Sequence, residues 1–111
     1  SVDAFVLSSP EYHGTMSGVM KNSLDWLSFN QTSGKVFAFI STLGGQSNTT
    51  TLNHMRTVVR WIHGFSIPEQ LVIAKVKTAF DDDGNLIDDD IKNRVEKFVD
   101  SIIKHTEKLR G

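Results

Sequence analysis

The stretch AFVLSSPEYHGTMSGVMKNSLDWL, residues 4–27, decides the fold. Its first four residues form an uninterrupted apolar run, which is typical of a strand buried on both faces of a parallel sheet. Residues 8–18 then carry a proline, a carboxylate, an aromatic ring, an imidazole and two glycines, which is more chemistry than a turn requires. Apolar residues next return at helical spacing, so we predict a helix over residues 17–29 with Ser17 as its N-cap.

The same order of strand, turn and helix recurs downstream. Residues 36–40 predict a second buried strand, and the glycine-bearing turn STLGGQSN leads from it into a predicted helix over residues 49–63. Gly64 is expected to end that helix, and Pro68 prevents it from resuming. Residues 71–73 predict a third strand. Residues 89–109 predict a long amphipathic helix, whose acidic start suits the positive end of a helix dipole.

Strands that alternate with helices predict an α/β domain with a parallel sheet covered on both faces. In such sheets ligands bind beyond the carboxyl ends of the strands, at the crevice where the strand order reverses. Both turns leave the carboxyl ends of consecutive strands, so we expect them at one edge of the sheet. Gly44 and Gly45 would let backbone amides point into the crevice and donate to an electron-rich heterocycle. Together the two turns favour a binding site.

Composition limits the classes of partner. The 111 residues, 39% of them apolar, fit one globular domain. With 12 basic and 13 acidic side chains the net charge is -1, which predicts neither a nucleic-acid nor an anionic-membrane partner, since both require clustered Lys and Arg. No apolar run approaches the length of a membrane span. The lack of cysteine excludes disulfides and thiolate zinc sites, and it suits a reducing cytoplasm.

The sequence gives little support for a metal site or for a catalytic nucleophile. The segment DDDGN suggests a calcium-binding EF-hand loop, but the positions for its glycine and bidentate glutamate hold Leu86 and Lys92. His54 and His63 are too far apart in sequence to share a helical face as adjacent metal ligands. The serines and histidine of the first turn lack the G-x-S-x-G elbow of a hydrolase. We therefore predict no metal site and no catalytic residue.

The side chains of the first turn each allow two interpretations. Glu11 could act as a general base, but no second carboxylate stands at an interpretable spacing, so a role in holding the backbone is favoured. Tyr12 can stack on a flat ligand or fill a hydrophobic gap. His13 can donate to a ligand or simply be solvated. The polar residues of the following helix fit a solvated face at least as well as ligand contact.

The stretch SSPEYHGTMSGVMKNSLDWL closely resembles the signature of the NAD(P)H-dependent FMN reductases, a flavodoxin-like family that includes azobenzene, chromate and quinone reductases. In that pattern a P-E-Y-[NH] turn is followed by a K-N-x-[LI]-D helix. The matching residues here are Pro10, Glu11, Tyr12, His13, Lys21, Asn22, Leu24 and Asp25. The glycine turn at residues 42–45 also resembles the family, and the resemblance extends over essentially the whole chain.

The resemblance implies a flavodoxin-like three-layer α/β/α fold of strand order 2-1-3-4-5, with FMN bound noncovalently at the switch point. Hydride would pass from NADPH or NADH through the flavin to an acceptor such as a quinone, an azo compound or a metal oxyanion. One side of the flavin would lie along the first turn and the other would meet the glycine turn. The implied cofactor-binding residues are Pro10, Glu11, Tyr12, His13, Thr42, Gly44 and Gly45.

Family members begin with a β-α-β-α unit that carries the phosphate-binding loop, and residues 1–111 hold no counterpart of it. We therefore expect a single flavodoxin-like domain, formed by the third to fifth strands and their helices, as the C-terminal part of a longer chain. Its first strand would otherwise leave an apolar edge unpaired. The alternative function is a noncatalytic flavodoxin-like remnant that serves as a protein-interaction module.

Family members commonly form dimers or tetramers through the helices that follow the two turns. The resemblance therefore implies a homodimer or homotetramer in the cytoplasm, with a small-molecule electron acceptor as the other partner. The exposed apolar contacts that we predict for this assembly are Met16, Trp26, Met55 and Trp61.

Overall fold

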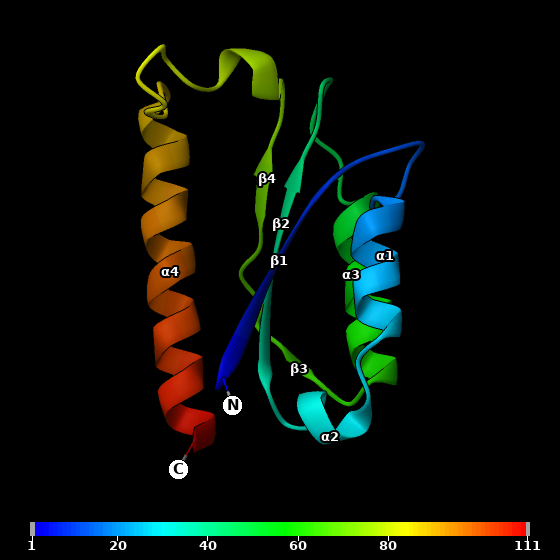
Figure 1. The fold of residues 1–111 in the computed structure, drawn as a ribbon. Coiled ribbons are helices and arrows are strands. Elements are labelled where there is room, and N and C mark those ends of the chain that lie inside the picture. The colour runs from blue at the N-terminus through cyan, green and yellow to red at the C-terminus, as the bar shows by residue number, and fades with distance from the viewer. Residues whose placement is uncertain (1, 111) are drawn as a thin grey trace.

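The computed structural model describes residues 2–110 as a parallel sheet between two layers of helices (Figure 1). The strands are β1 (Ala4–Pro10), β2 (Val36–Thr42), β3 (Phe65–Ser66) and β4 (Leu71–Ile73). The helices are α1 (Gly18–Asp25), α2 (Phe29–Thr32), α3 (Thr50–Trp61) and α4 (Asp89–Arg110), with a 3₁₀ turn, η1 (Val76–Thr78), between β4 and α4. In Figure 1, α1 and α3 cover one face of the sheet and α4 covers the other. The predicted α/β class and the parallel sheet are confirmed.

The sheet is organised around β2. Strand β1 pairs with it in parallel over its whole length, from Ala4 opposite Val36 to Pro10 opposite Thr42. On the other side of β2, the short strands β3 and β4 pair in parallel at successive positions. The order β1–β2–β4 is the one that the resemblance implies for the third to fifth strands of a flavodoxin-like sheet. Strand β3 was not predicted, because two residues carry no periodicity.

Alternate residues of β2 supply two separate cores. Phe37 and Phe39 point toward α1 and α3, where they pack with Leu52, Met55 and Val59. Val36 and Ala38 point the other way and pack with Leu71, Ile73 and Phe98 beneath α4. Both sets are almost completely buried, which confirms that β2 is a strand covered on both faces.

Strand β1 departs from its prediction of burial on both faces. Leu7 is buried against α1 and α3, but Val6, on the opposite face, is 49% exposed. The reason is the position of α4, which packs over β2 and β4 and covers β1 on that side only near Ala4 (Figure 1). Within residues 2–110, β1 pairs only with β2, so its outer edge is free.

The first helix is shorter than predicted. Ser17 is its N-cap as expected, and the Ser17 hydroxyl accepts a hydrogen bond from the Met20 amide at 3.1 Å. The helix ends at Asp25 instead of continuing to residue 29, because Ser28 starts a new helix. The Gln31 side chain reaches back to the Ser28 amide at 2.7 Å and completes a capping box for α2.

Helix α3 ends two residues before the predicted boundary, and the residue that ends it is also different. His63, with φ of 65°, takes the left-handed conformation that the sequence suggested for Gly64. Gly64 serves another purpose, since a Cβ there would lie 2.6 Å from two ring carbons of Phe37 and 2.7 Å from a methyl group of Val59. The missing side chain lets the chain pass close over the core.

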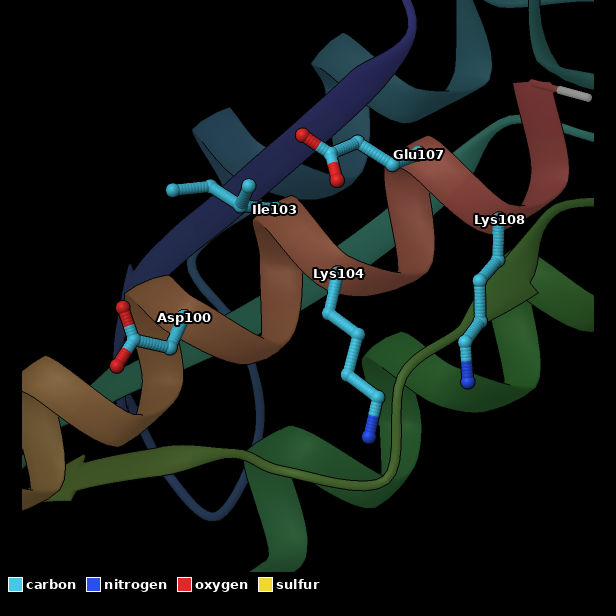
Figure 2. A pocket seen from close by; sticks show the side chains of 5 residues that line it. All are labelled: Asp100, Ile103, Lys104, Glu107 and Lys108. Carbon is cyan, nitrogen blue, oxygen red and sulfur yellow. The ribbon is translucent and has the colours of Figure 1, made fainter.

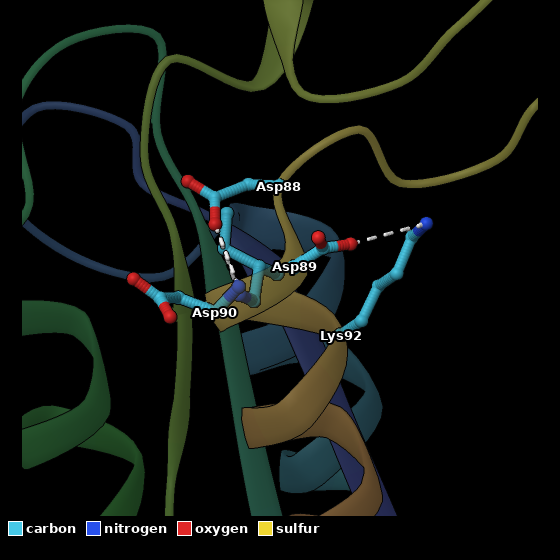
Figure 3. Close-up of polar contacts among 5 residues, drawn as sticks. Asp88, Asp89, Asp90 and Lys92 are labelled. Atoms are coloured by element: carbon cyan, nitrogen blue, oxygen red, sulfur yellow. Dashed lines mark hydrogen bonds and ion pairs between the residues drawn. The ribbon is translucent and has the colours of Figure 1, made fainter.

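Helix α4 begins at Asp89, as predicted (Figure 3). The Asp88 carboxylate accepts hydrogen bonds from the amides of Asp90 at 2.8 Å and Ile91 at 3.4 Å, so it caps the helix start. Lys92 lies 3.7 Å from the Asp89 carboxylate, one turn along. Within residues 2–110, no helix combines the length and the apolar character needed to cross a bilayer.

A polar contact fastens the middle of α4 to the segment before β4. The buried hydroxyl of Ser101 donates to the carboxylate of Glu69, and this hydrogen bond lowers the pKa of Glu69. His105 lies 3.2 Å from the same hydroxyl, but its Nδ1 also contacts the Ser101 carbonyl oxygen at 2.8 Å. Serine, histidine and glutamate therefore meet as a structural contact, because the serine proton is directed to the carboxylate instead of to a base.

We predict that Gly64→Ala destabilises the protein by about 1–3 kcal/mol, because the added methyl group overpacks the core at Phe37. Gly18→Ala is the matched control, since Gly18 has no atom within 4 Å of the position of a Cβ. Urea denaturation of the two variants measures the difference. Equal stability of Gly64→Ala and the parent chain would contradict the described close approach.

Candidate functional site

The two predicted turns lie together at the carboxyl end of the sheet. Pro10 and Thr42, the last residues of β1 and β2, are opposite one another in the parallel register. Beyond them the Glu11 amide donates to the Thr42 carbonyl oxygen at 2.8 Å, so the turns are directly hydrogen-bonded. The expectation that both turns share one edge of the sheet is confirmed, and this edge is where ligands bind in open parallel sheets.

The first turn is a tight hairpin. Tyr12 and Thr15 exchange two backbone hydrogen bonds, of 2.8 and 3.2 Å, across a two-residue loop. The loop residues His13 and Gly14 have φ of 53° and 84°, the left-handed pair that a type I′ turn requires. Histidine is among the few side chains found regularly at positive φ. The hairpin presents Tyr12 at its base with 58% of its surface exposed.

Side chains fix the hairpin to the sheet. The buried Ser9 hydroxyl donates to the Pro10 carbonyl oxygen at 2.8 Å and accepts from the Ser17 amide at 2.9 Å, which joins the two ends of the loop. The Glu11 carboxylate accepts from the Gly14 amide at 2.7 Å. This contact matches the backbone-holding role that the sequence favoured for Glu11, and it leaves the hairpin with a defined shape.

The second turn is held by a segment that sequence reasoning missed. Leu43 is 3% exposed, and its amide donates to the Ile73 carbonyl oxygen at 3.0 Å. Its own carbonyl oxygen accepts from Val76, and Gly45 accepts from Lys75, both at 2.9 Å. The chain after β4 therefore forms a third wall of this edge. No periodic signal predicted this wall, because its contacts are backbone hydrogen bonds.

The second turn also offers unused hydrogen-bonding groups. Gly44 and Gly45 are exposed, and nothing lies within 4 Å of where their Cβ atoms would be. The amides of Gly44, Gly45 and Gln46 donate to none of residues 2–110. The buried hydroxyls of Ser41 and Thr51, before and after the turn, likewise find no partner in that part of the chain. The exposed amides of the turn can donate to a polar ligand edge or to water.

The histidines do not gather into a metal site. His54 contacts Thr15 at 2.6 Å, His63 stacks on Phe29 with ring centroids 4.2 Å apart, and His105 belongs to the contact on α4. Among the described residues, no three His, Asp or Glu side chains are placed to hold a metal ion.

A different hollow, of about 410 Å³, lies along the outer surface of α4 (Figure 2). All five residues that line it come from this one helix: Asp100, Ile103, Lys104, Glu107 and Lys108. Because no second element faces them, the hollow lacks the convergent groups of a ligand site.

Two of the four residues predicted as exposed subunit contacts are exposed, and two are buried. Trp26 and Trp61 are 81% and 66% exposed, as expected for residues available to a partner. The prediction is wrong for Met16 and Met55, since Met16 is 8% exposed and Met55 is fully buried. Both methionines belong to the core between the sheet and helices α1 and α3.

Comparison with known proteins agrees with this architecture. The sequence model of the NADPH-dependent FMN reductases matches residues 1–78. An "NADPH-dependent FMN reductase ArsH" of Acidithiobacillus ferrooxidans is 34% identical over an alignment 111 residues long, which covers 96% of this chain and 47% of that protein. An "FMN-dependent NADPH-azoreductase" of Staphylococcus saprophyticus is 37% identical over 103 residues, which cover 91% of this chain and 55% of the relative.

Among solved structures, the apo form of an NADH:FMN oxidoreductase (EMOB) superposes with a TM-score of 0.67 at 17% identity. The match covers 96% of this chain and 53% of that one, and at this identity it shows the fold alone. The chain spans about half the length of the curated relatives it matches. Since the family model covers more than half of the chain and the resemblance in residues 8–27 agrees with it, the chain belongs to the NADPH-dependent FMN reductase family.

Proposed function

We propose that this chain is part of an FMN-dependent NAD(P)H oxidoreductase that passes hydride through the flavin to a small acceptor. The observation that carries the proposal is the meeting of the two turns, joined by the hydrogen bond from Glu11 to Thr42, at the ligand-binding edge of the sheet. Family membership supports the same chemistry.

The groups at this edge fit a flavin. We propose that the Pro10–His13 turn lies along one side of the isoalloxazine ring with the exposed ring of Tyr12 as a wall. Thr42, Gly44 and Gly45 would meet the polar pyrimidine edge, for which the free amides of the glycine turn are suitable donors. A bound FMN would supply the redox chemistry between NAD(P)H and the acceptor, while these residues would hold and orient the ring.

The names of the relatives narrow the co-substrate and the acceptor. The reductase and the azoreductase are both NADPH-dependent by name, which supports NADPH over NADH. An azo compound is the acceptor that the azoreductase name supports, and quinones and metal oxyanions accept electrons from the same exposed ring face. No general acid or base is assigned, and the hydrogen bond that Glu11 accepts from the Gly14 amide fits a role in holding the turn.

Absorbance tests the proposal directly. We expect the purified protein to retain flavin bands after FMN is added and the unbound FMN is removed, and we expect its NADPH oxidation to rise when a quinone or azo dye is supplied. The second candidate is a noncatalytic interaction module, favoured by the exposed Val6 on β1 and Ile103 on α4. A protein that takes up no FMN, even when extended by upstream residues, would support the module and contradict the enzyme.

Substitution in the glycine turn tests the placement of the ring. Gly44→Val should weaken FMN binding by about tenfold, roughly 1.4 kcal/mol, because its side chain enters the space proposed for the pyrimidine edge. Folding should be preserved, since nothing lies within 4 Å of that position. Gln46→Ala, which keeps every backbone amide, is the matched control. Unchanged affinity of Gly44→Val in an FMN titration would contradict this placement.

We also propose that the free edge of β1 pairs with a strand of the N-terminal β-α-β-α unit that the family resemblance implies. Exposed apolar side chains at this edge support the proposal, with Val6 on β1 and Val99 and Ile103 on the uncovered flank of α4. Val6→Lys should leave the stability of the 111-residue chain within about 0.5 kcal/mol of the parent, because Val6 is half exposed.

In a version extended upstream, the same Val6→Lys substitution should destabilise by about 2–3 kcal/mol, because the lysine is then buried. Urea denaturation of the parent and the Val6→Lys variant, in the 111-residue chain and in the extended version, measures the two changes in stability. An equally small loss of stability in both versions would contradict the pairing of β1 with an upstream strand.

A homodimer or homotetramer in the cytoplasm remains our prediction for the assembled protein. Trp26 and Trp61, exposed at the ends of α1 and α3, support an interface on this side of the sheet, because large aromatic side chains are enriched in interfaces. Light scattering of the purified protein measures the oligomeric state.

A further inference from the structure

The segment that follows β4 places a lysine beside the glycine turn. The Lys75 amide donates to the Gly45 carbonyl oxygen at 2.9 Å, and the next amide, that of Val76, donates to the Leu43 carbonyl oxygen at the same distance. These two hydrogen bonds fix the main chain of Lys75 against the turn whose free amides are proposed to meet the polar edge of the flavin.

Lys75 has an unusual backbone conformation for a lysine. Its φ of 47° and ψ of 49° lie in the left-handed region, which glycine and asparagine adopt with less strain. The hydrogen bonds to the turn come from the main chain, so the lysine side chain is not needed to form them. Because strained residues of this kind cluster at functional sites, the side chain is a candidate for a functional role.

The positive charge of Lys75 is not neutralised by a neighbour. The side chain is exposed, and within residues 2–110 it takes part in none of the ion pairs. Residues 74–78 contain two lysines and no acidic residue. The Asp81 carboxylate, the next one along the chain, accepts two amides of its own loop at 2.9 Å. Figure 1 shows the chain running from η1 away from β2 to the start of α4.

The charge lies close enough to the glycine turn to act on a group bound there. A lysine side chain extends about 6 Å from its Cα, and the main chain of Lys75 contacts Gly45 directly. The ammonium group therefore stays within about 8–10 Å of the turn, which is about one Debye length at physiological salt. At about 8 Å and an effective dielectric constant of about 40–80, a unit charge changes an equilibrium about two- to sixfold.

We propose that Lys75 is an electrostatic residue of the flavin site, whose positive charge stabilises the negative charge that the pyrimidine part of FMN gains on two-electron reduction. Charge near this part of the ring is one of the means by which a protein tunes a bound flavin. The inference rests on the proposed function and deepens it, because it assigns a residue that sets the redox balance of the cofactor and not only its position.

The test compares the binding of oxidised and reduced FMN. Titration gives the dissociation constant of oxidised FMN, and the potential of the bound flavin, measured against a reference dye, gives the ratio of the two constants. Lys75→Asn removes the charge with a residue that suits the left-handed conformation. We expect it to weaken the binding of reduced FMN about two- to sixfold more than that of oxidised FMN, which lowers the two-electron potential by about 10–25 mV.

The shift should follow the charge at position 75. Lys75→Arg should leave the potential unchanged, and Lys75→Glu should about double the shift of Lys75→Asn. Both shifts should shrink as added salt screens the charge. A purely structural role of Lys75 would produce neither this order nor this salt dependence.

Lys108→Gln is the matched control, since Lys108 is an exposed lysine in the last turn of α4, at the other end of the sheet (Figure 1). An equal shift from the control, or a potential that does not follow the charge at position 75, would overturn the role of Lys75 and leave the flavin site in place. If neither the 111-residue chain nor the version extended upstream takes up FMN, the proposed function fails and this inference fails with it.

Discussion

The parallel pairing of β1 with β2 is the constraint on which both the core and the site depend. Seven residues of each strand are in register, and the pair ends with Pro10 opposite Thr42. A slip of one residue would turn Leu7 and Ser9 out of the interior and would displace the first turn by about 3.3 Å along the strand. The hydrogen bond from Glu11 to Thr42 could not survive such a shift, so the hydrophobic pattern of β1 also sets where the two turns meet.

The layered fold could be predicted because its signals are local. Residues 36–40 are apolar without interruption, and α4 has both its acidic start and its helical period in the sequence. The predictions failed at positions whose burial or backbone conformation depends on segments far away in the sequence. Val6 is exposed because of where α4 packs, and the left-handed residue after α3 is His63, while Gly64 lies against Phe37. A sequence pattern contains neither fact, since each depends on a contact made only after folding.

The candidate site shows the same division. The placement of the turns at one edge followed from strand order, but the hairpin shape required the φ angles of His13 and Gly14. Backbone hydrogen bonds from the chain after β4 support the second turn. Because every residue type can form such bonds, the sequence did not predict this support. Met16 and Met55 were predicted to be exposed subunit contacts, but methionine fits a core equally well. Only packing shows that they fill the space beneath α1 and α3.

The unpaired edge of β1 has a consequence for the behaviour of the chain in concentrated solution. An exposed strand of seven residues, with few charges and an outward valine, is a template onto which any extended peptide can add. In a form of the protein in which no upstream strand covers this edge, copies could meet edge to edge, so aggregation would increase with concentration and persist at high salt, where charge repulsion is screened. Within β1 the one residue that opposes such pairing is Pro10 at its end, since no charged side chain interrupts the edge before it.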